Sequence, residues 1–259
     1  MLKAVVLAGR RNDGKLRAEA PDVAWEALIP IQGHPMTAYV LAAVSSVPEV
    51  SETVLVGPGE LAAGVGHVVP AGQAVTDSLR AAIQALALHP DGPDELLVVA
   101  GDAPLITAAA LADFLARCRG RRLQFGYPIV SREDCEAELP GVRRTYVRLR
   151  EGRFTGGNCF YLQAAVVPRA LALLERVYRD RKNPLRLAAL FGWSTVLAVA
   201  LGVASLPALE RTGSRLLGAK AGAVPMREAG IGVDVDKPED LALCQRVLQG
   251  RWPLAERRG

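Results

Sequence analysis

Short apolar runs alternate with longer segments along the first half of the chain. The first run, Ala4–Ala8, is unbroken and ends at Gly9, which is typical of a strand covered on both faces of a parallel sheet. We expect further strands at 53–56 and 95–100 and helices at 35–47, 74–88 and 108–119. This alternation predicts an α/β fold with a mostly parallel sheet. The right-handed crossover rule then places the loops that follow the strands at one edge of that sheet.

The second half of the chain is less regular. We expect strands with turns over 123–163, a helical region over 164–217, a last strand at Ile231–Asp236 and a closing helix from Pro238 to Leu248. No internal repeat or low-complexity linker divides the chain. The prediction is therefore one domain over 1–259 with a helical insertion at about 164–229.

Residues 187–206 form an uncharged stretch long enough to cross a bilayer. Basic residues precede the stretch: Arg176, Arg179, Arg181, Lys182 and Arg186. It is rich in Ala and interrupted by Gly192 and Gly202, which favours a buried helical hairpin and leaves a peripheral membrane contact or a true span as alternatives. A span would separate Asp102 from Asp236, which are assigned below to one site.

Composition narrows the function classes. The 259 residues include 31 Lys+Arg against 27 Asp+Glu, a net charge of +4, and are 50% hydrophobic. Because no basic block is interleaved with aromatic residues, nucleic-acid binding is not expected. Four cysteines without a CxxC pair and three histidines without HxxxH spacing argue against a disulfide framework or a histidine-ligated metal. The apolar N-terminus is too short for a signal peptide, and we expect a cytoplasmic protein, with membrane association left open.

Asp102 is the strongest single candidate for chemistry. It follows the expected strand at 95–100, and α/β folds bind their ligands at this edge of the sheet. A carboxylate there can hold Mg²⁺, which takes one or two carboxylates together with phosphate oxygens. The alternative role is a helix cap, which Thr107 serves better because it directly precedes the helical segment.

A second pair of carboxylates lies near the C-terminus. Asp234 and Asp236 flank Val235 in the expected last strand, and alternate residues of a strand share a face. Asp236 is the expected partner of Asp102 at Mg²⁺, with Asp234 in reserve. Asp236 can also cap the helix that begins near Pro238, and the two roles are compatible.

Two further segments carry polar groups suited to a nucleotide. The loop after the first strand combines Gly9 and Gly14 with Arg10, Arg11 and Lys15, and backbone N–H groups and cations in such a loop can hold phosphates. It is not a P-loop, because no GK[ST] follows at the required spacing. The segment 71–79, which includes Ser78, lies at an expected helix N-terminus and either contacts a base or sugar or only caps the helix.

Four stretches, in order along the chain, carry a resemblance to a known family. They are Val5–Gly9 (VVLAG), Ala27–Met36 (ALIPIQGHPM), Gly101–Leu105 (GDAPL) and Asp236–Leu241 (DKPEDL). These stretches are similar to the LAGG, KxLxxxxGxP, GDxP and DTPEDL motifs of nucleotidyltransferases of the molybdenum-cofactor (MobA-like) type. The resemblance covers most of 1–163 and 230–248. It implies the glycosyltransferase-A-like fold of nucleotide-diphospho-sugar transferases, a Rossmann-like three-layer α/β/α arrangement with a mostly parallel mixed sheet.

The resemblance also implies roles for individual residues. The nucleotide would lie against Leu7, Ala8, Gly9, Arg10, Arg11, Gly14, Ser78 and Gly101. Lys15 would replace the family's phosphate-binding Arg and act in catalysis beside Asp102 and Asp236, the two Mg²⁺ ligands. Gly157 and Asn158 belong to a TGGN sequence similar to the acceptor-side loop of sugar-phosphate members, and would face the acceptor.

The chain departs from the family pattern at two positions. Arg10 replaces the second Gly of LAGG, in a loop one residue longer. Glu26 stands where the family has a Lys that neutralises phosphate charge, and a carboxylate there would repel the substrate. Either a loop cation (Arg10, Arg11, Lys15 or Arg17) supplies the charge instead, or the donor site has diverged.

The expected function is a Mg²⁺-dependent transfer of NMP from an NTP to a phosphorylated or hydroxyl small-molecule acceptor, with release of pyrophosphate. One alternative is a glycosyltransferase of the same fold that uses a nucleotide-sugar. The other, based on Glu26 and Arg10, is a catalytically diverged nucleotide-binding protein. The sequence does not identify the base or the acceptor, and it leaves a homodimer open.

Overall fold

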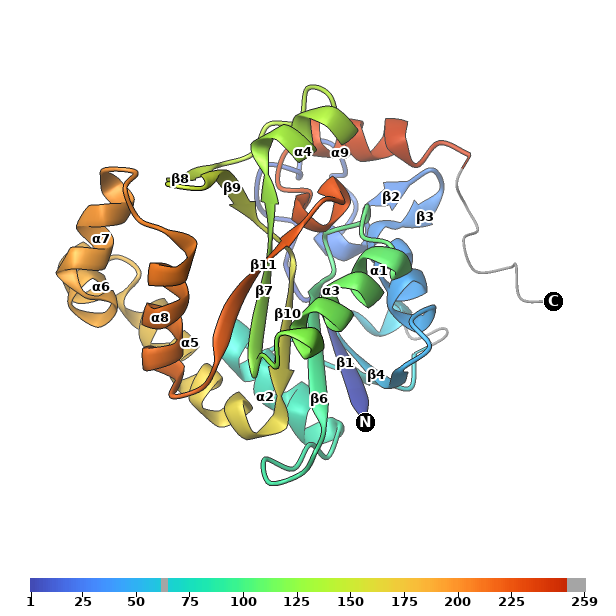
Figure 1. Cartoon of the computed structure of the whole chain (residues 1–259). Coiled ribbons are helices and arrows are strands. Elements are labelled where there is room, and N and C mark those ends of the chain that lie inside the picture. Colours follow the sequence, from blue (N-terminus) through green and yellow to red (C-terminus); the bar gives the residue numbers. More distant parts are fainter. Residues whose placement is uncertain (62–64, 251–259) are drawn as a thin grey trace.

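A mixed, mostly parallel sheet forms the centre of the molecule, with helices on both of its faces (Figure 1). The computed structural model describes residues 1–61 and 65–250. In the sheet the strands follow the order β5-β4-β1-β6-β10-β7-β9-β8, and β11 pairs with β7. Their bounds are Leu2–Leu7 (β1), Val50–Val56 (β4), His67–Val69 (β5), Glu95–Ala100 (β6), Phe125–Ser131 (β7), Val147–Leu149 (β8), Gly152–Gly156 (β9), Cys159–Gln163 (β10) and Ala221–Met226 (β11).

The parallel part of the sheet lies around β1. Val5 pairs with Val54 of β4 on one side and with Val98 of β6 on the other, and both pairings are parallel. β10 runs antiparallel to both β6 and β7, and β11 runs parallel to β7. The expected α/β fold with a mostly parallel mixed sheet is confirmed.

Alternating residues of β1 separate two hydrophobic cores, because successive strand side chains point to opposite faces. Ala4 and Val6 pack in the core under α1 (Met36–Ser45) and α3 (Ala108–Gly120). Val5 packs in the other core, under α2 (Val75–Ala85) and α5 (Val167–Asp180). The apolar run at the N-terminus is therefore buried on both faces, as its lack of alternation predicts.

The remaining elements are short. The helices are α4 (Arg132–Glu138), α6 (Pro184–Phe191), α7 (Trp193–Ala200), α8 (Leu206–Leu217) and α9 (Pro238–Val247). Single turns of 3₁₀ helix lie at Glu26–Leu28 (η1), Gly59–Leu61 (η2), Ala164–Val166 (η3) and Ala229–Gly232 (η4), and a small separate sheet pairs Pro30–Ile31 (β2) with His34–Pro35 (β3).

Three expectations for the second half are wrong. Residues 132–138 form helix α4 within a region expected to hold strands and turns. Strand β11 at 221–226 lies inside the expected helical insertion of about 164–229, so the helical part of that region ends at Leu217. Residues 231–236 are not a strand, because their polar backbone groups bond to loops: Val235 N–H donates to the Asp102 carbonyl at 2.9 Å, and the Ile231 carbonyl accepts from Asn158.

The uncharged stretch 187–206 forms two short helices. α6 and α7 have eight residues each and are separated at Gly192, whose φ of +93° favours glycine. Among the described residues no helix is long and apolar enough to cross a membrane. The stretch is also not the buried hairpin that was expected, because α7 has no buried residue.

We expect Gly101→Ala to lower the free energy of unfolding by about 1–3 kcal/mol, as overpacking of a rigid site does. A Cβ at Gly101 would lie 2.8 Å from the Leu7 carbonyl oxygen and 2.9 Å from the Ala8 Cβ. The matched control is Gly120→Ala, because no atom lies within 4 Å of a Cβ there and the position ends helix α3. Urea unfolding of both variants tests the expectation, and equal midpoints would contradict it.

Candidate active site

The loop that carries Asp102 is fixed by its neighbours at the end of β6. Gly101 N–H donates to the Leu7 carbonyl at 2.8 Å, and the Thr37 hydroxyl donates to the Gly101 carbonyl at 2.7 Å. Ala8 N–H donates in turn to the Val56 carbonyl at 2.7 Å. Leu7, Ala8 and Gly101 therefore form one rigid edge where β1, β4 and β6 end, and Asp102 projects from it.

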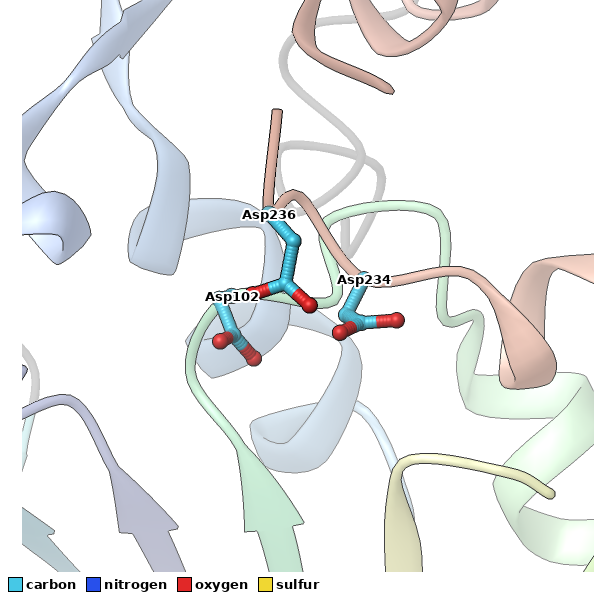
Figure 2. Close-up of side chains that lie close together, drawn as sticks. All are labelled: Asp102, Asp234 and Asp236. Carbon is cyan, nitrogen blue, oxygen red and sulfur yellow. The ribbon is translucent and has the colours of Figure 1, made fainter. Parts of the chain in front are cut away.

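Asp102, Asp234 and Asp236 come together at this edge (Figure 2). One carboxylate oxygen from each of the three lies within 4.8 Å of the others. The hydrogen bond between Val235 N–H and the Asp102 carbonyl holds the C-terminal segment beside the β6 loop. The two carboxylates of the D-V-D sequence thus share a site with Asp102, although the segment that carries them is a loop.

Asp236 does not cap helix α9. The N-cap residue of α9 is Lys237, and no side chain accepts a hydrogen bond there. Instead the carboxylate of Asp240, in the first turn of α9, accepts from Asp236 N–H at 3.2 Å. The side chain of Asp236 is therefore directed to the acidic cluster, and its backbone is held by the helix.

The surroundings shift the pKa values of the three carboxylates differently. Burial and the nearby Asp234 raise the pKa of Asp102 to about 7. Burial also raises the pKa of Asp234, although Arg144 opposes the shift. Burial acts the same way on Asp236, but there the hydrogen bond from Arg10 prevails and holds its pKa below the usual range. Asp102 is thus the carboxylate whose negative charge is least compensated.

Arg10 links the cluster to Glu26. Its guanidinium donates to Asp236 at 2.5 Å, and its Nε lies 3.1 Å from Glu26 Oε2. Glu26 is only 2% exposed, and its backbone N–H donates to the Arg10 carbonyl at 3.0 Å. Although burial lowers it, the hydrogen bond to Asp236 and the charge of Glu26 raise the pKa of Arg10, which therefore stays charged.

Glu26 is a buried acidic residue at the start of η1. Burial raises its pKa, and the charge of Arg10 opposes that shift. Within 1–61 and 65–250 its Oε2 has no hydrogen-bond partner, because the contact with Arg10 is an ion pair without hydrogen-bond alignment. Glu26, at the position where the family has a Lys, therefore orients Arg10, which the loop after β1 supplies.

Arg144 is a residue of the site that the sequence analysis missed. It lies in the loop between α4 and β8 and forms an ion pair with the carboxylate of Asp234. It also donates to the Asp234 backbone carbonyl at 3.4 Å. No motif surrounds Arg144 in the sequence, and only tertiary structure brings it to a partner 90 positions away.

The glycine loop lies beside the start of α2. Gly9 is packed so closely that a Cβ there would lie 2.3 Å from the Ala71 Cβ. The Ser78 hydroxyl accepts from Gly72 N–H at 3.0 Å, and the Asp77 carboxylate accepts from Ala74 N–H at 3.0 Å. The polar groups of 71–79 therefore bond within the segment, and Ala71 is the residue that packs against Gly9.

The cations of the loop are not equivalent. Arg11 lies over the ring of Trp25, 3.8 Å from its centroid, and Gly14 lies close to the Glu26 carboxylate. Lys15 is exposed and forms no ion pair or hydrogen bond within the part of the chain that the structure describes. Arg10 is the loop cation that the structure brings to the acidic cluster, and the catalytic role of Lys15 stays a prediction.

Asn158 links the end of β6 to the C-terminal segment at Ile231. Its carbonyl accepts from Ala100 N–H, and its own N–H donates to the Ile231 carbonyl, both at 2.8 Å. Its side-chain amide donates to the same carbonyl at 3.3 Å. Gly157 N–H donates to the Pro128 carbonyl at 2.8 Å. These bonds place the TGGN loop beside the strand that leads to Asp102.

An apolar cavity of about 340 Å³ lies next to this loop, between the sheet and α8. Its walls include Phe125, Tyr127, Phe154, Leu206 and Leu209, and it reaches Thr155 and Gly156 at the end of β9. Because Gly156 directly precedes Gly157, the cavity adjoins the loop expected to face the acceptor.

The mixed α/β sheet, with an aspartate after β6 and a second acidic pair beside it, is the arrangement expected of the nucleotidyltransferase class. The family described as the MobA-like NTP transferase domain matches residues 4–200, and the chain belongs to this family. The family resemblance expected from the sequence is thereby confirmed.

Three solved structures share the fold of this chain. A hypothetical transferase from Thermus thermophilus is 37% identical, with 92% of this chain and 98% of that chain covered and a TM-score of 0.81. A CMP:2-keto-3-deoxy-manno-octonic acid synthetase complexed with CTP is 14% identical, with a TM-score of 0.58 over 96% of this chain and 99% of that one. A nucleotidyl transferase from Methanothermobacter thermautotrophicus is 17% identical, with a TM-score of 0.54 over 97% and 99%. The last two show the shared fold alone.

Among curated proteins, the bifunctional protein GlmU of Parvibaculum lavamentivorans is 35% identical over 125 residues. This stretch is 44% of the present chain and 26% of GlmU. The chain therefore matches about a quarter of the length of that relative.

We expect the stability of the metal-free protein to fall as the pH rises from about 4 to about 7. With a pKa of about 7 in the folded state and about 3.9 when unfolded, Asp102 binds more protons folded than unfolded within that window. Above pH 7 the folded protein must keep Asp102 ionised in a place that disfavours its charge, and Asp102→Asn removes this cost. The variant should raise the free energy of unfolding at pH 8 by ~1–3 kcal/mol, and each kcal/mol should raise the thermal midpoint by about 2–4 °C.

Thermal unfolding at pH 4 and pH 8 in EDTA measures this effect. The matched control is Asp91→Asn, because Asp91 is exposed in a loop far from the cluster. A gain for Asp102→Asn that is the same at both pH values would contradict the raised pKa.

Proposed function

We propose that this chain is a Mg²⁺-dependent nucleotidyltransferase that moves NMP from an NTP to a phosphorylated or hydroxyl small molecule and releases pyrophosphate. The observation that carries the proposal is the meeting of Asp102, Asp234 and Asp236 beside the Gly9 loop, with Arg10 between the two. A synthetase with the same fold is described as a complex with CTP, which supports an NTP as the donor.

The acidic cluster fits a divalent cation. Three carboxylate oxygens within 4.8 Å of one another are the hard ligands that Mg²⁺ prefers. Asp102 forms no ion pair with any residue in the described ranges, so no cationic side chain occupies its oxygens. Asp236 and Asp234 each keep one carboxylate oxygen that accepts no arginine hydrogen bond. We assign Asp102 and Asp236 as the ligands, with Asp234 in reserve. When bound, the ion neutralises negative charge on the phosphate oxygens.

The residues of the loop bind and orient the triphosphate. Arg10 is held from both sides by Glu26 and Asp236, so its remaining N–H groups are directed with little loss of side-chain entropy. Gly9 lies so close to Ala71, just before the start of α2, that a side chain at position 9 would collide there, and we assign the backbone N–H groups of this loop to the phosphates. Lys15, on the exposed part of the loop, is assigned to the outer phosphates.

The acceptor is proposed to bind beside Gly157 and Asn158, over the cavity that Tyr127 and Phe154 line. From there an acceptor oxygen attacks the α-phosphorus in line. The new P–O bond forms as the bond from the α-phosphorus to the bridging oxygen breaks, and pyrophosphate leaves with that oxygen. A hydroxyl acceptor loses its proton, whereas a phosphate acceptor attacks as an anion. Catalysis comes mainly from positioning and charge neutralisation, without a covalent intermediate.

We expect one NTP, together with Mg²⁺, to raise the thermal midpoint of the protein, and pyrophosphate release to follow in a screen of phosphorylated and hydroxyl acceptors. Asp102→Ala should abolish turnover, and Asp91→Ala, an exposed loop variant, should keep it. Full activity of Asp102→Ala would refute the assignment of the site. NTP binding without product would instead favour a catalytically diverged protein, and hydrolysis of a nucleotide-sugar would favour a glycosyltransferase.

We expect Arg10→Met to lower kcat/KM for the NTP by about 10²-fold or more, as removal of one preorganised donor does. Lys15→Met should lower it less than ~5-fold, because Lys15 lies on the exposed side of the loop. Since Arg10→Met alone leaves Glu26 buried without its counter-charge, the double variant with Glu26→Gln serves as a second test in a stable background. The reverse order of effects would return the main role to Lys15.

A further inference from the structure

Helix α7 exposes an apolar stripe to solvent. Trp193 and Leu197 are each 60% exposed, and Val196 and Leu201 are exposed beside them. These positions recur at the spacing that places residues on one side of a helix. A surface helix of a globular protein normally turns such a stripe to the core, but no residue of α7 is buried.

The stripe lies within a segment rich in exposed apolar side chains, whose helices α5 and α6, and α6 and α7, contact each other. Seven of the eleven large hydrophobic side chains that are exposed in 1–61 and 65–250 lie between positions 178 and 203: Tyr178, Leu185, Trp193, Val196, Leu197, Leu201 and Val203. We call these seven residues the α6–α7 face. Clusters of this kind mark interaction sites. In Figure 1, α6 and α7 lie at the left edge of the molecule, away from the helices that cover the main core.

Basic side chains border the α6–α7 face. Arg181 lies 3.5 Å from the centroid of the Tyr178 ring, and Lys182 and Arg186 are exposed next to it. At the junction of the two helices Arg215 donates to the Phe191 carbonyl at 3.2 Å. Beyond α7 the side chain of Arg148 packs against Gly202. Cations therefore lie at both ends of α7.

Acidic groups are scarce around the same face. The sequence has no Asp or Glu from 181 to 209. The carboxylates that flank this segment have partners: Asp180 pairs with Arg186 of the border itself, Glu151 accepts from Leu206 N–H, and Glu210 pairs with Arg121. The face thus combines exposed Trp and Leu side chains with a border of excess positive charge.

We propose that the α6–α7 face binds the surface of an anionic lipid bilayer, with α7 lying in the plane of the interface. Apolar side chains enter the boundary between headgroups and acyl chains, while arginine and lysine side chains reach the lipid phosphates. Trp193 suits this position, because its ring is apolar and its N–H is polar. Two eight-residue helices are too short to span a bilayer, so the contact is peripheral.

Charge favours a lipid surface over a second copy of the chain. A two-fold contact through this face would bring the same basic border against itself, whereas an anionic bilayer is complementary to it. This inference does not depend on the proposed catalytic activity, and its test needs no substrate.

Sedimentation of the full chain with vesicles tests the inference. At low salt we expect binding to vesicles of phosphatidylcholine with phosphatidylglycerol and at least ~10-fold weaker binding to phosphatidylcholine alone, decreasing as salt is added. Trp193→Ser with Leu197→Ser should lower the affinity by at least ~10-fold. Lys182→Gln with Arg186→Gln should lower it by a similar factor, at about 5-fold per cation.

Matched variants separate this effect from general damage. Val75→Ser removes an exposed apolar side chain from α2, and Arg246→Gln removes an exposed cation from α9; neither should alter vesicle binding. Trp193→Phe should keep binding but lose the blue shift of tryptophan emission that vesicles induce. All variants change exposed residues, so their thermal midpoints should match that of the parent, except that the variant without Arg186 also loses the partner of the buried Asp180.

Two results would overturn the inference. One is vesicle binding that is unchanged in Trp193→Ser with Leu197→Ser. The other is the absence of vesicle binding together with a dimer, seen by analytical ultracentrifugation, that the same double variant dissociates. The second result would assign the α6–α7 face to a contact between two copies of the chain.

Discussion

Repulsion among three aspartates is the constraint around which this site is built. Asp102, Asp234 and Asp236 lie close enough to share one cation, and like charges at such distances oppose ionisation. Two arginines from distant parts of the chain offset the repulsion, Arg10 at Asp236 and Arg144 at Asp234. Asp102 has no such partner within the described residues, and it is the carboxylate whose pKa rises to about 7. The arginines thus compensate the pair at the C-terminal segment and leave the β6 aspartate with uncompensated charge.

The exchange of charges at Glu26 and Arg10 follows from the same constraint. A lysine in the buried turn η1 is the family pattern, whereas this chain has a carboxylate there and an arginine in the neighbouring loop. The positive charge therefore stays at the edge of the sheet although the residue that carries it has changed. A buried carboxylate without a counter-ion would be costly, so Glu26 and Arg10 depend on each other, and neither position can be interpreted alone.

The sequence predicted the parts of the site that depend on local pattern. The position of Asp102 after a buried strand was predicted correctly, because the apolar run of β6 ends at Ala100, two residues before it. Asp234 and Asp236 were grouped with it for a wrong local reason, a strand that does not exist, because their loop bonds to Asp102 and Asn158 rather than to a neighbouring strand. Arg144 and the burial of Glu26 were beyond prediction, since both depend on contacts between distant segments. Strand β11 was missed because Ala-Gly-Ala-Val-Pro-Met has neither a β-branched run nor clear alternation.

The pairing of Arg10 with Asp236 has a consequence for biosynthesis. The two residues are 226 positions apart, and contacts of such separation form late in folding because a long loop must close first. During translation, β1, β4 and β6 emerge and can pair well before the segment with Asp234 and Asp236 leaves the ribosome. A nascent chain therefore presents Asp102 without its partners, and the complete acidic cluster forms only after the segment with Asp234 and Asp236 has left the ribosome.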